Sequence, residues 1–217
     1  MRGLGRLLLV GGDGMIGRHL ASGLRQAGWQ VTATSRRMAD PRLHLDLAQA
    51  AQSPPSLPAC EVVLLVAAAE QAVLALGRQG AVLRLSKVVA PELALFAGWA
   101  AALRQRQSIA PFADMYMAPV PVVAVTQLVH AIAAARSTGI HQLSGDQDRS
   151  YALAAQLLAR ALGCDPALVR PGAADPVLHP AAALVRHSTL DMARETEIFG
   201  VPPPEYRATL AWLAAGL

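Results

Sequence analysis

Four glycines lie close together near the start of the chain, directly after an apolar run at residues 7–10. Gly11, Gly14 and Gly17 fit the pattern G-x-x-G-x-x-G, and Gly12 with Gly14 and Gly17 fits G-x-G-x-x-G. In such a turn the first glycine permits a tight bend, the second lets the backbone approach a pyrophosphate, and the third lets a helix pack close to the strand. The pattern predicts a nucleotide-binding turn after a buried strand, and a glycine-rich hairpin is the alternative.

The helix expected after this turn, residues 15–27, would attract the negatively charged phosphates of the nucleotide. Its first N–H groups and the positive end of its dipole face the bound phosphates. Ile16, Leu20 and Leu24 share one face, which predicts packing on the sheet. The cofactor-binding residues predicted in this stretch are Gly11, Gly12, Asp13, Gly14, Met15, Ile16 and Gly17.

The residues that end the second predicted strand, residues 29–35, bear on the choice of cofactor. An NAD site would carry an acidic residue there to accept hydrogen bonds from the ribose 2′-hydroxyl. This chain offers Ser35, Arg36 and Arg37, which suit a 2′-phosphate. The sequence therefore favours NADP(H) over NAD(H), with a solvated arginine pair as the alternative.

Two further segments are expected to line the cofactor. A short third strand is predicted over residues 42–46, and the residues at its end lie where an adenine amino group could be met, although Asp46 could equally cap a helix. Residues 61–69 have the composition of a second buried parallel strand, which ends in small residues. The cofactor-lining residues predicted here are Asp46, Leu47, Ala67, Ala68 and Ala69.

Composition limits the class of protein. A length of 217 residues suffices for one α/β domain, and hydrophobic residues make up 53%, yet no apolar run approaches the roughly 18 residues of a membrane span. The net charge of +4 is spread without a basic run, which argues against nucleic-acid binding. Two distant cysteines and no signal-peptide pattern indicate a cytoplasmic protein with reduced thiols, and no spacing of histidines and cysteines predicts a metal site.

Together these motifs resemble the extended short-chain dehydrogenase/reductases, in particular the branch of dTDP-4-dehydrorhamnose reductases and sugar-nucleotide reductases. The resemblance continues through a strand at 81–88, a loop and helix at 111–135, and a strand and helix at 139–155. It implies an α/β, doubly wound (Rossmann), mostly parallel sheet that binds NAD(P) and a nucleotide sugar. It further implies a single domain over 1–217 with a small C-terminal substrate lobe formed by about 107–122 and 165–217.

The chain departs from this family where the chemistry should be. Such reductases carry Tyr-x-x-x-Lys, in which the tyrosine acts as the acid and the lysine lowers its pKa. The only lysine of this sequence is Lys87, and the residue four positions before it is Leu83. Ala69 is followed at once by a predicted helix, residues 70–78, which resembles the back half of the catalytic helix. The expected sheet is therefore shortened by about one βα unit.

Three hypotheses on function follow. The first is an NADP(H)-binding, reductase-like protein with little or no reductase activity. The second is an active NADPH-dependent oxidoreductase or epimerase of a nucleotide sugar, and the third is a non-catalytic regulatory or interaction subunit. Asp114 and Tyr116, in the loop where a family substrate would approach, are the candidates for a non-standard acid, and a turn aspartate and a half-buried aromatic are the alternative.

The remaining structural expectations concern the C-terminal part, His130 and the assembly. Residues 168–171 are expected to form an edge strand, Ser188 to Asp191 to open a helix, and residues 205–217 to form the final helix. His130 lies among apolar helix positions and is expected to be a core or interface histidine. The missing unit would uncover apolar positions of helix 70–78, which predicts a homo-oligomer, and no nucleic-acid or membrane partner is expected.

Overall fold

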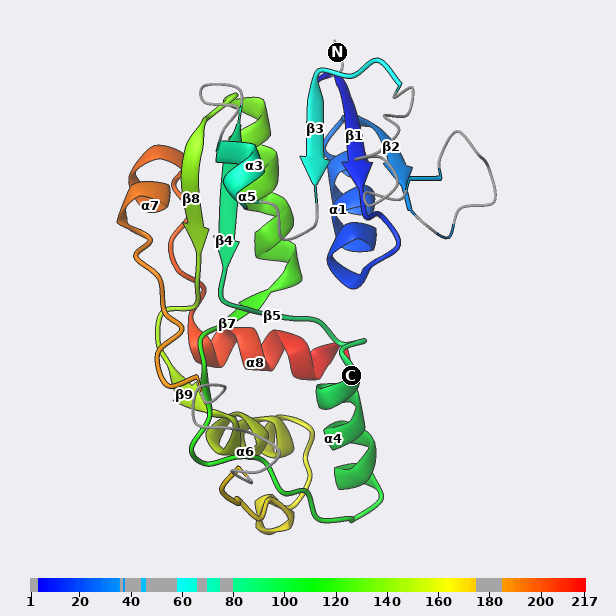
Figure 1. Cartoon of the computed structure of the whole chain (residues 1–217). Helices are drawn as coiled ribbons and strands as arrows, with labels where there is room; N and C mark the ends of the chain where they lie inside the picture. Colours follow the sequence, from blue (N-terminus) through cyan, green and yellow to red (C-terminus); the bar gives the residue numbers. More distant parts are fainter. Residues whose placement is uncertain are drawn as a thin grey trace. The chain divides into compact units, whose positions relative to one another are not determined.

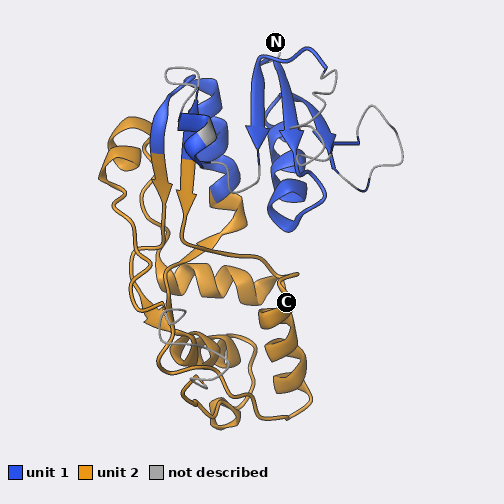
Figure 2. Cartoon of the chain, viewed as in Figure 1, with its two compact units in different colours: residues 1–82, 125–140 blue, residues 83–124, 141–217 orange. Residues whose placement is uncertain are grey.

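The computed structural model describes residues 4–35, 37, 44–45, 58–65, 70–74, 80–174 and 185–217 (Figure 1). The chain forms two compact units, coloured separately in Figure 2. The first comprises residues 1–82 and 125–140, and the second comprises residues 83–124 and 141–217. Both segments of the predicted lobe fall within the second unit, and the single-domain organisation stays a prediction.

The first unit contains the predicted parallel sheet. Its strands are, in spatial order, β2 (Gln30–Thr34), β1 (Arg6–Val10) and β3 (Val62–Leu65). Leu7 of the central strand lies opposite Val31 on one side and Val62 on the other, and both pairings are parallel. Leu7 and its two successors are at most 1% exposed, as the apolar run predicts for a strand that is buried on both faces.

Helix α1 (Met15–Gln26) packs against β1 and β2 (Figure 1). Leu20 and Leu24 are buried on the predicted face, and Gly28 ends the segment at φ +99°. At the end of β2 the chain bridges in parallel from Ser35 to His44. The remainder of the third strand predicted over 42–46 lies outside the described residues.

Helix α5 (Val122–Ala134) belongs to the first unit from Val125 on. A Cβ on Gly23 of α1 would lie 2.4 Å from Thr126 Cγ2, so the glycine permits close packing of the two helices. Trp29 Nε1 donates to His130 Nδ1 at 3.2 Å, and the histidine is half-buried. The nearby elements are α3 (Glu70–Leu74), β4 (Ala81–Leu85) and β8 (Gly139–Leu143), of which β4 and β8 pair as a two-stranded sheet.

The second unit has a helical core with short strand pairs. Its helices are α4 (Ala94–Arg104), α6 (Tyr151–Ala161), α7 (Ala193–Phe199) and α8 (Tyr206–Ala215). The parallel pair is β5 (Lys87–Val89) with β7 (Pro119–Pro121), and the antiparallel pair is β6 (Tyr116–Met117) with β9 (Arg149–Ser150). The core residues include Val89, Phe96, Met117, Leu158, Tyr206 and Leu213. The prediction of a final helix is confirmed, and the Glu205 carboxylate caps it.

Two predictions for this region are wrong. Residues 168–171 do not form an edge strand, because Asp165 caps a short 3-10 helix, Pro166–Leu168, and Val169 makes only an isolated bridge to Ile109. The helix expected to open at Ser188 begins only at Ala193. No helix of the described residues is long and apolar enough to cross a membrane.

Candidate functional site

The glycine turn joins β1 to α1 and is fixed to the end of β2. The N–H groups of Gly11 and Gly12 both donate to the carbonyl oxygen of Thr34 at 3.0 Å. Gly11 has φ +85°, a conformation that favours glycine, and a Cβ on Gly17 would lie 2.1 Å from the Gly11 oxygen. A Cβ on Gly12 would lie 2.7 Å from that of Ala33. The backbone conformation at Gly11, and the packing at Gly12 and Gly17, therefore favour glycine within the protein itself.

Gly14 differs from these three glycines. It is exposed, its φ of −68° suits any residue, and an added Cβ would make only an ordinary contact with Gly11. It is the N-cap of α1, whose first two residues are Met15 and Ile16. This helix start has no side-chain cap and no acidic residue in its first turn. An uncapped helix start beside an open glycine is the arrangement that binds a pyrophosphate through backbone N–H groups.

The residues after β2 lie beside this turn. Ser35 is 3% exposed, and its hydroxyl accepts the N–H of Arg37 at 3.0 Å. The guanidinium Nε of Arg37 lies 3.8 Å from the Asp13 carboxylate, while Arg18 donates to the Asp13 carbonyl at 2.6 Å. Arg37 was singled out in the sequence, whereas the contact of Arg18 was not. The predicted cofactor residues outside the described residues are Arg36, Asp46, Leu47, Ala67, Ala68 and Ala69.

The two candidate acids belong to the second unit, whereas the glycine turn belongs to the first. Both carboxylate oxygens of Asp114 accept the N–H of Ala174, at 3.0 and 3.2 Å. This is the contact of a loop-fixing aspartate. Tyr116 lies in β6, where its N–H donates to the carbonyl of Val185 at 2.8 Å, and it is 36% exposed. Of the two, Tyr116 is the side chain more accessible to a ligand.

The other tyrosines and the lysine are also in the second unit. Tyr151 is the first residue of α6, and burial raises the pKa of its hydroxyl. Tyr206 is 1% exposed, burial raises its pKa as well, and its hydroxyl has no partner among the described residues. Lys87 begins β5, opposite Pro119. Burial thus makes two of the three tyrosines weaker acids than usual.

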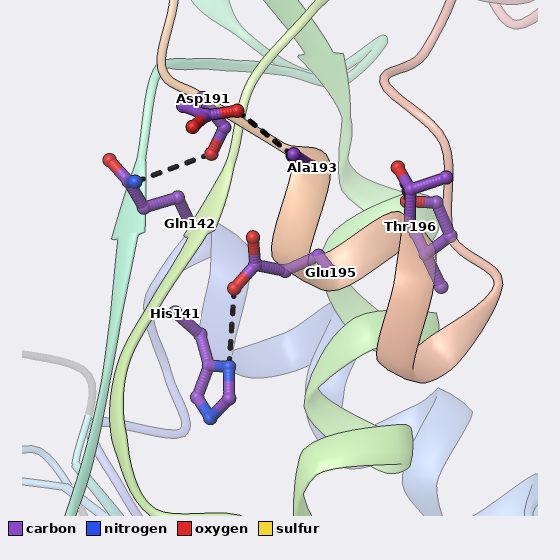
Figure 3. Close-up of polar contacts among 7 residues, drawn as sticks. His141, Gln142, Asp191, Ala193, Glu195 and Thr196 are labelled. Carbon is purple, nitrogen blue, oxygen red and sulfur yellow. Dashed lines mark hydrogen bonds and ion pairs between the residues drawn. The ribbon is translucent and has the colours of Figure 1, made fainter.

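Sequence reasoning did not identify a buried polar pair in the second unit. The Nδ1 atom of His141 lies 3.2 Å from the Glu195 carboxylate, and the two side chains are 0% and 2% exposed. Figure 3 shows the imidazole pointing towards Glu195 on α7, with Asp191 contacting Gln142 and Ala193 nearby. Burial lowers the pKa of His141, and the hydrogen bond to Glu195 only partly offsets this effect. The pair anchors α7 to β8.

Within the described ranges, no three histidine, cysteine, aspartate or glutamate residues lie close enough together to hold a metal ion. Cys60 and Cys164 are both free thiols.

Several solved structures share this fold. The dTDP-glucose 4,6-dehydratase of Bacillus anthracis str. Ames, in complex with NAD, has a TM-score of 0.74 at 10% identity over 97% of this chain and 96% of its own. The dTDP-4-dehydrorhamnose reductase of the same organism, in complex with NADP, scores 0.73 at 12% identity over 98% of each chain. UDP-glucose 4-epimerase of Thermotoga maritima, with UDP-glucose, scores 0.67 at 14% identity over 97% of this chain and 98% of its own.

At these identities the likeness shows the fold, and it confirms the Rossmann-like α/β class with a parallel sheet. With 217 residues the chain is shorter than is typical of such enzymes.

Family models match nearly the whole chain, although no curated protein matches it. The model of the NAD dependent epimerase/dehydratase family matches residues 7–83. The model of the RmlD substrate binding domain matches residues 58–216, well over half of the sequence. The protein therefore belongs to the RmlD substrate-binding domain family, a sugar-nucleotide reductase-like and epimerase-like group that binds NAD(P).

Proposed function

We propose that this protein binds NADP(H) at the glycine turn and is a sugar-nucleotide reductase-like protein with little or no reductase activity. The observation that carries the proposal is the difference among the glycines. Gly11 is required by its positive φ, and Gly12 and Gly17 are closed in by the protein's own atoms, while Gly14 is open at the uncapped start of α1. A side chain is absent at Gly14 for no reason of packing, which supports a ligand that approaches the backbone there.

The preference for NADP(H) is supported by Arg37. Its backbone is held to the buried Ser35, and its guanidinium extends beside the glycine turn, at Asp13. A 2′-phosphate bound by an arginine gains a charge-assisted hydrogen bond, and losing one costs about 1.5–3 kcal/mol, or roughly ten- to a hundredfold in affinity. Arg36, the second predicted ligand, lies outside the described residues.

The low reductase activity that we propose is supported by the surroundings of the tyrosine side chains. Bound NADPH would supply a hydride, and reduction of a ketone then also needs a proton donor held beside the substrate. No lysine stands four residues after any tyrosine in the sequence. Burial raises the pKa of Tyr151 and Tyr206, opposite to the effect that a neighbouring lysine has in an active reductase. Tyr116 remains as the exposed candidate for a non-standard acid.

The substrate class follows from the family, and we propose a nucleotide sugar. The RmlD substrate binding domain model covers the second unit up to residue 216, and the similar epimerase of Thermotoga maritima was solved with UDP-glucose. Binding measurements with a panel of nucleotide sugars would identify the sugar and the base that the protein recognises.

Cofactor binding is tested with Gly14→Ala. The added methyl group has room in the protein but occupies the approach to the backbone, so we expect NADP(H) affinity to fall roughly ten- to a hundredfold, with only the small loss of thermal stability that alanine causes at an N-cap. Gly98→Ala is the matched control, because Gly98 also has open space around its Cβ position and belongs to the second unit. Calorimetric titration with NADPH and NADH measures both variants. Equal affinity of Gly14→Ala and the unmutated protein would refute the site.

Chemistry is tested by single-turnover and steady-state assays with NADPH and 4-keto nucleotide sugars. General acid catalysis contributes about 10²–10⁴ in rate, so we expect reduction at least a hundredfold slower than in an intact reductase. Turnover at the ordinary rate of about 1–10³ s⁻¹ would contradict the proposal. Tyr116→Phe and Asp114→Asn would then identify the acid.

A further inference from the structure

Asp13 is the only charged side chain of the glycine turn, residues 11–14. A carboxylate in a loop that is shaped for phosphates repels them, so its presence there calls for a physical reason. The structure offers one, because Asp13 Oδ2 lies 3.8 Å from the guanidinium Nε of Arg37.

We propose that Asp13 sets cofactor specificity by competing with the 2′-phosphate of NADP(H) for Arg37. In the free protein the carboxylate is the partner of the guanidinium, and on binding the 2′-phosphate displaces it. The competition lowers the preference for NADP(H) over NAD(H) that Arg37 alone would give. This inference rests on the proposed function, since it takes Arg37 as a ligand of the 2′-phosphate.

The backbone geometry fixes the two residues beside each other. Gly11 and Gly12 donate to Thr34 at the end of β2, which sets the turn against that strand. Arg37 is held three residues later through its N–H to Ser35. Neither backbone has to move for the Arg37 side chain to change partner.

The side chains, in contrast, can exchange partners at low cost. The side chain of Arg37 is 88% exposed and that of Asp13 is 38% exposed, so water solvates either group when the pair opens. Exposed ion pairs are weak and are screened by salt. Removing the competitor should therefore change cofactor discrimination by about two- to fivefold.

Asp13→Asn tests the inference through the ratio of the NAD⁺ to the NADP⁺ dissociation constant, measured by calorimetry at low ionic strength. We expect this ratio to rise about two- to fivefold. Repulsion between Asp13 and the pyrophosphate weakens both cofactors alike and cancels in the ratio. In an Arg37→Ala background Asp13→Asn should leave the ratio unchanged, because the guanidinium for which Asp13 and the 2′-phosphate compete is absent. Salt at about 1 M should shrink the effect, since the Debye length falls to about 3 Å.

Glu61→Gln is the matched control. It removes another exposed carboxylate of the first unit, one paired with Arg6 at the opposite end of β1 from the glycine turn. The control should leave the ratio unchanged.

The inference is overturned if Asp13→Asn leaves the ratio unchanged, or raises it equally in the Arg37→Ala background. Failure of the proposed 2′-phosphate ligand has a different signature, in which Arg37→Ala alone does not lower the ratio. An unmutated protein without preference still decides the matter, because Asp13→Asn must then reveal a preference for NADP⁺.

Discussion

Truncating the buried Glu195 should destabilise the second unit more than any surface substitution. A carboxylate oxygen only accepts, so Nδ1 of His141 carries the hydrogen of their 3.2 Å contact. The other ring nitrogen, Nε2, has no partner among the described residues. Glu195→Ala therefore leaves both nitrogens of a buried ring without a hydrogen bond.

The magnitude follows from burial. Leaving a buried hydrogen-bonding group without its partner costs about 1–3 kcal/mol, and each kcal/mol shifts the melting temperature of a chain of this size by about 2–4 °C. We therefore expect a decrease of roughly 2–12 °C for Glu195→Ala. Glu195→Gln, which keeps an acceptor, should lose less. Replacing both residues by leucine should be nearly neutral, because no unpaired polar group remains.

The same pair predicts a pH dependence. Burial holds the pKa of His141 below its usual 6.5, so the unfolded chain takes up the proton first as pH falls. The contribution to stability is complete above pH 6.5 and is lost as pH falls through the lowered pKa. The double leucine variant should lack this part of the pH dependence, and a difference measurement isolates it because the five other histidines are common to both proteins.

Thermal unfolding followed by circular dichroism, from pH 5 to pH 8, measures these effects. Hydrogen exchange at α7 shows whether the helix detaches locally before the unit unfolds. The reasoning is refuted if Glu195→Ala melts within 2 °C of the unmutated protein and α7 exchanges at the same rate. It is equally refuted if the double leucine variant is as unstable as Glu195→Ala.

Three other predictions concern different parts of the chain. Gly17→Ala should cost about 1–3 kcal/mol in a urea titration, because its Cβ would meet the Gly11 oxygen, whereas Gly98→Ala should be neutral or stabilising. Asp148→Ala should speed hydrogen exchange in residues 188–189 roughly tenfold, because the carboxylate accepts their N–H and hydroxyl groups, and unchanged exchange would exclude this anchor. The predicted homo-oligomer should dissociate in sedimentation on Leu74→Glu, a 37% exposed position of α3, and a monomeric unmutated protein would contradict it.

The glycine turn could be predicted from the sequence because its determinants are local. Gly11, Gly14 and Gly17 lie within seven residues. Their spacing indicates which glycine permits the tight bend, which leaves the backbone open to a ligand and which lets the helix pack on the strand. The structure separates these roles, since Gly17 contacts the Gly11 backbone and Gly14 contacts nothing closely. The strand before the turn, β1, could be predicted from its apolar composition for the same reason.

The anchors of the second unit could not be predicted, because they join distant segments. His141 and Glu195 are 54 residues apart, and Asp148 is 40 residues from Ser188. Nothing near either residue in the sequence indicates its partner. The candidate acid Asp114 illustrates the same limit, since its contact with Ala174 crosses 60 residues.

Ser188 shows how a distant partner overrides a local rule. A serine before an acidic turn has the signature of a helix N-cap, in which its hydroxyl accepts a backbone N–H. In the structure the hydroxyl instead donates to the Asp148 carboxylate at 2.7 Å and accepts the N–H of Ala118 at 2.9 Å. Hydrogen bonds to a charged group are roughly twice as strong as neutral ones. The Ser188 hydroxyl therefore binds the Asp148 carboxylate and does not cap a helix. The helix begins only at Ala193, whose N–H is accepted by the Asp191 carboxylate at 2.9 Å, while Met192 is the N-cap.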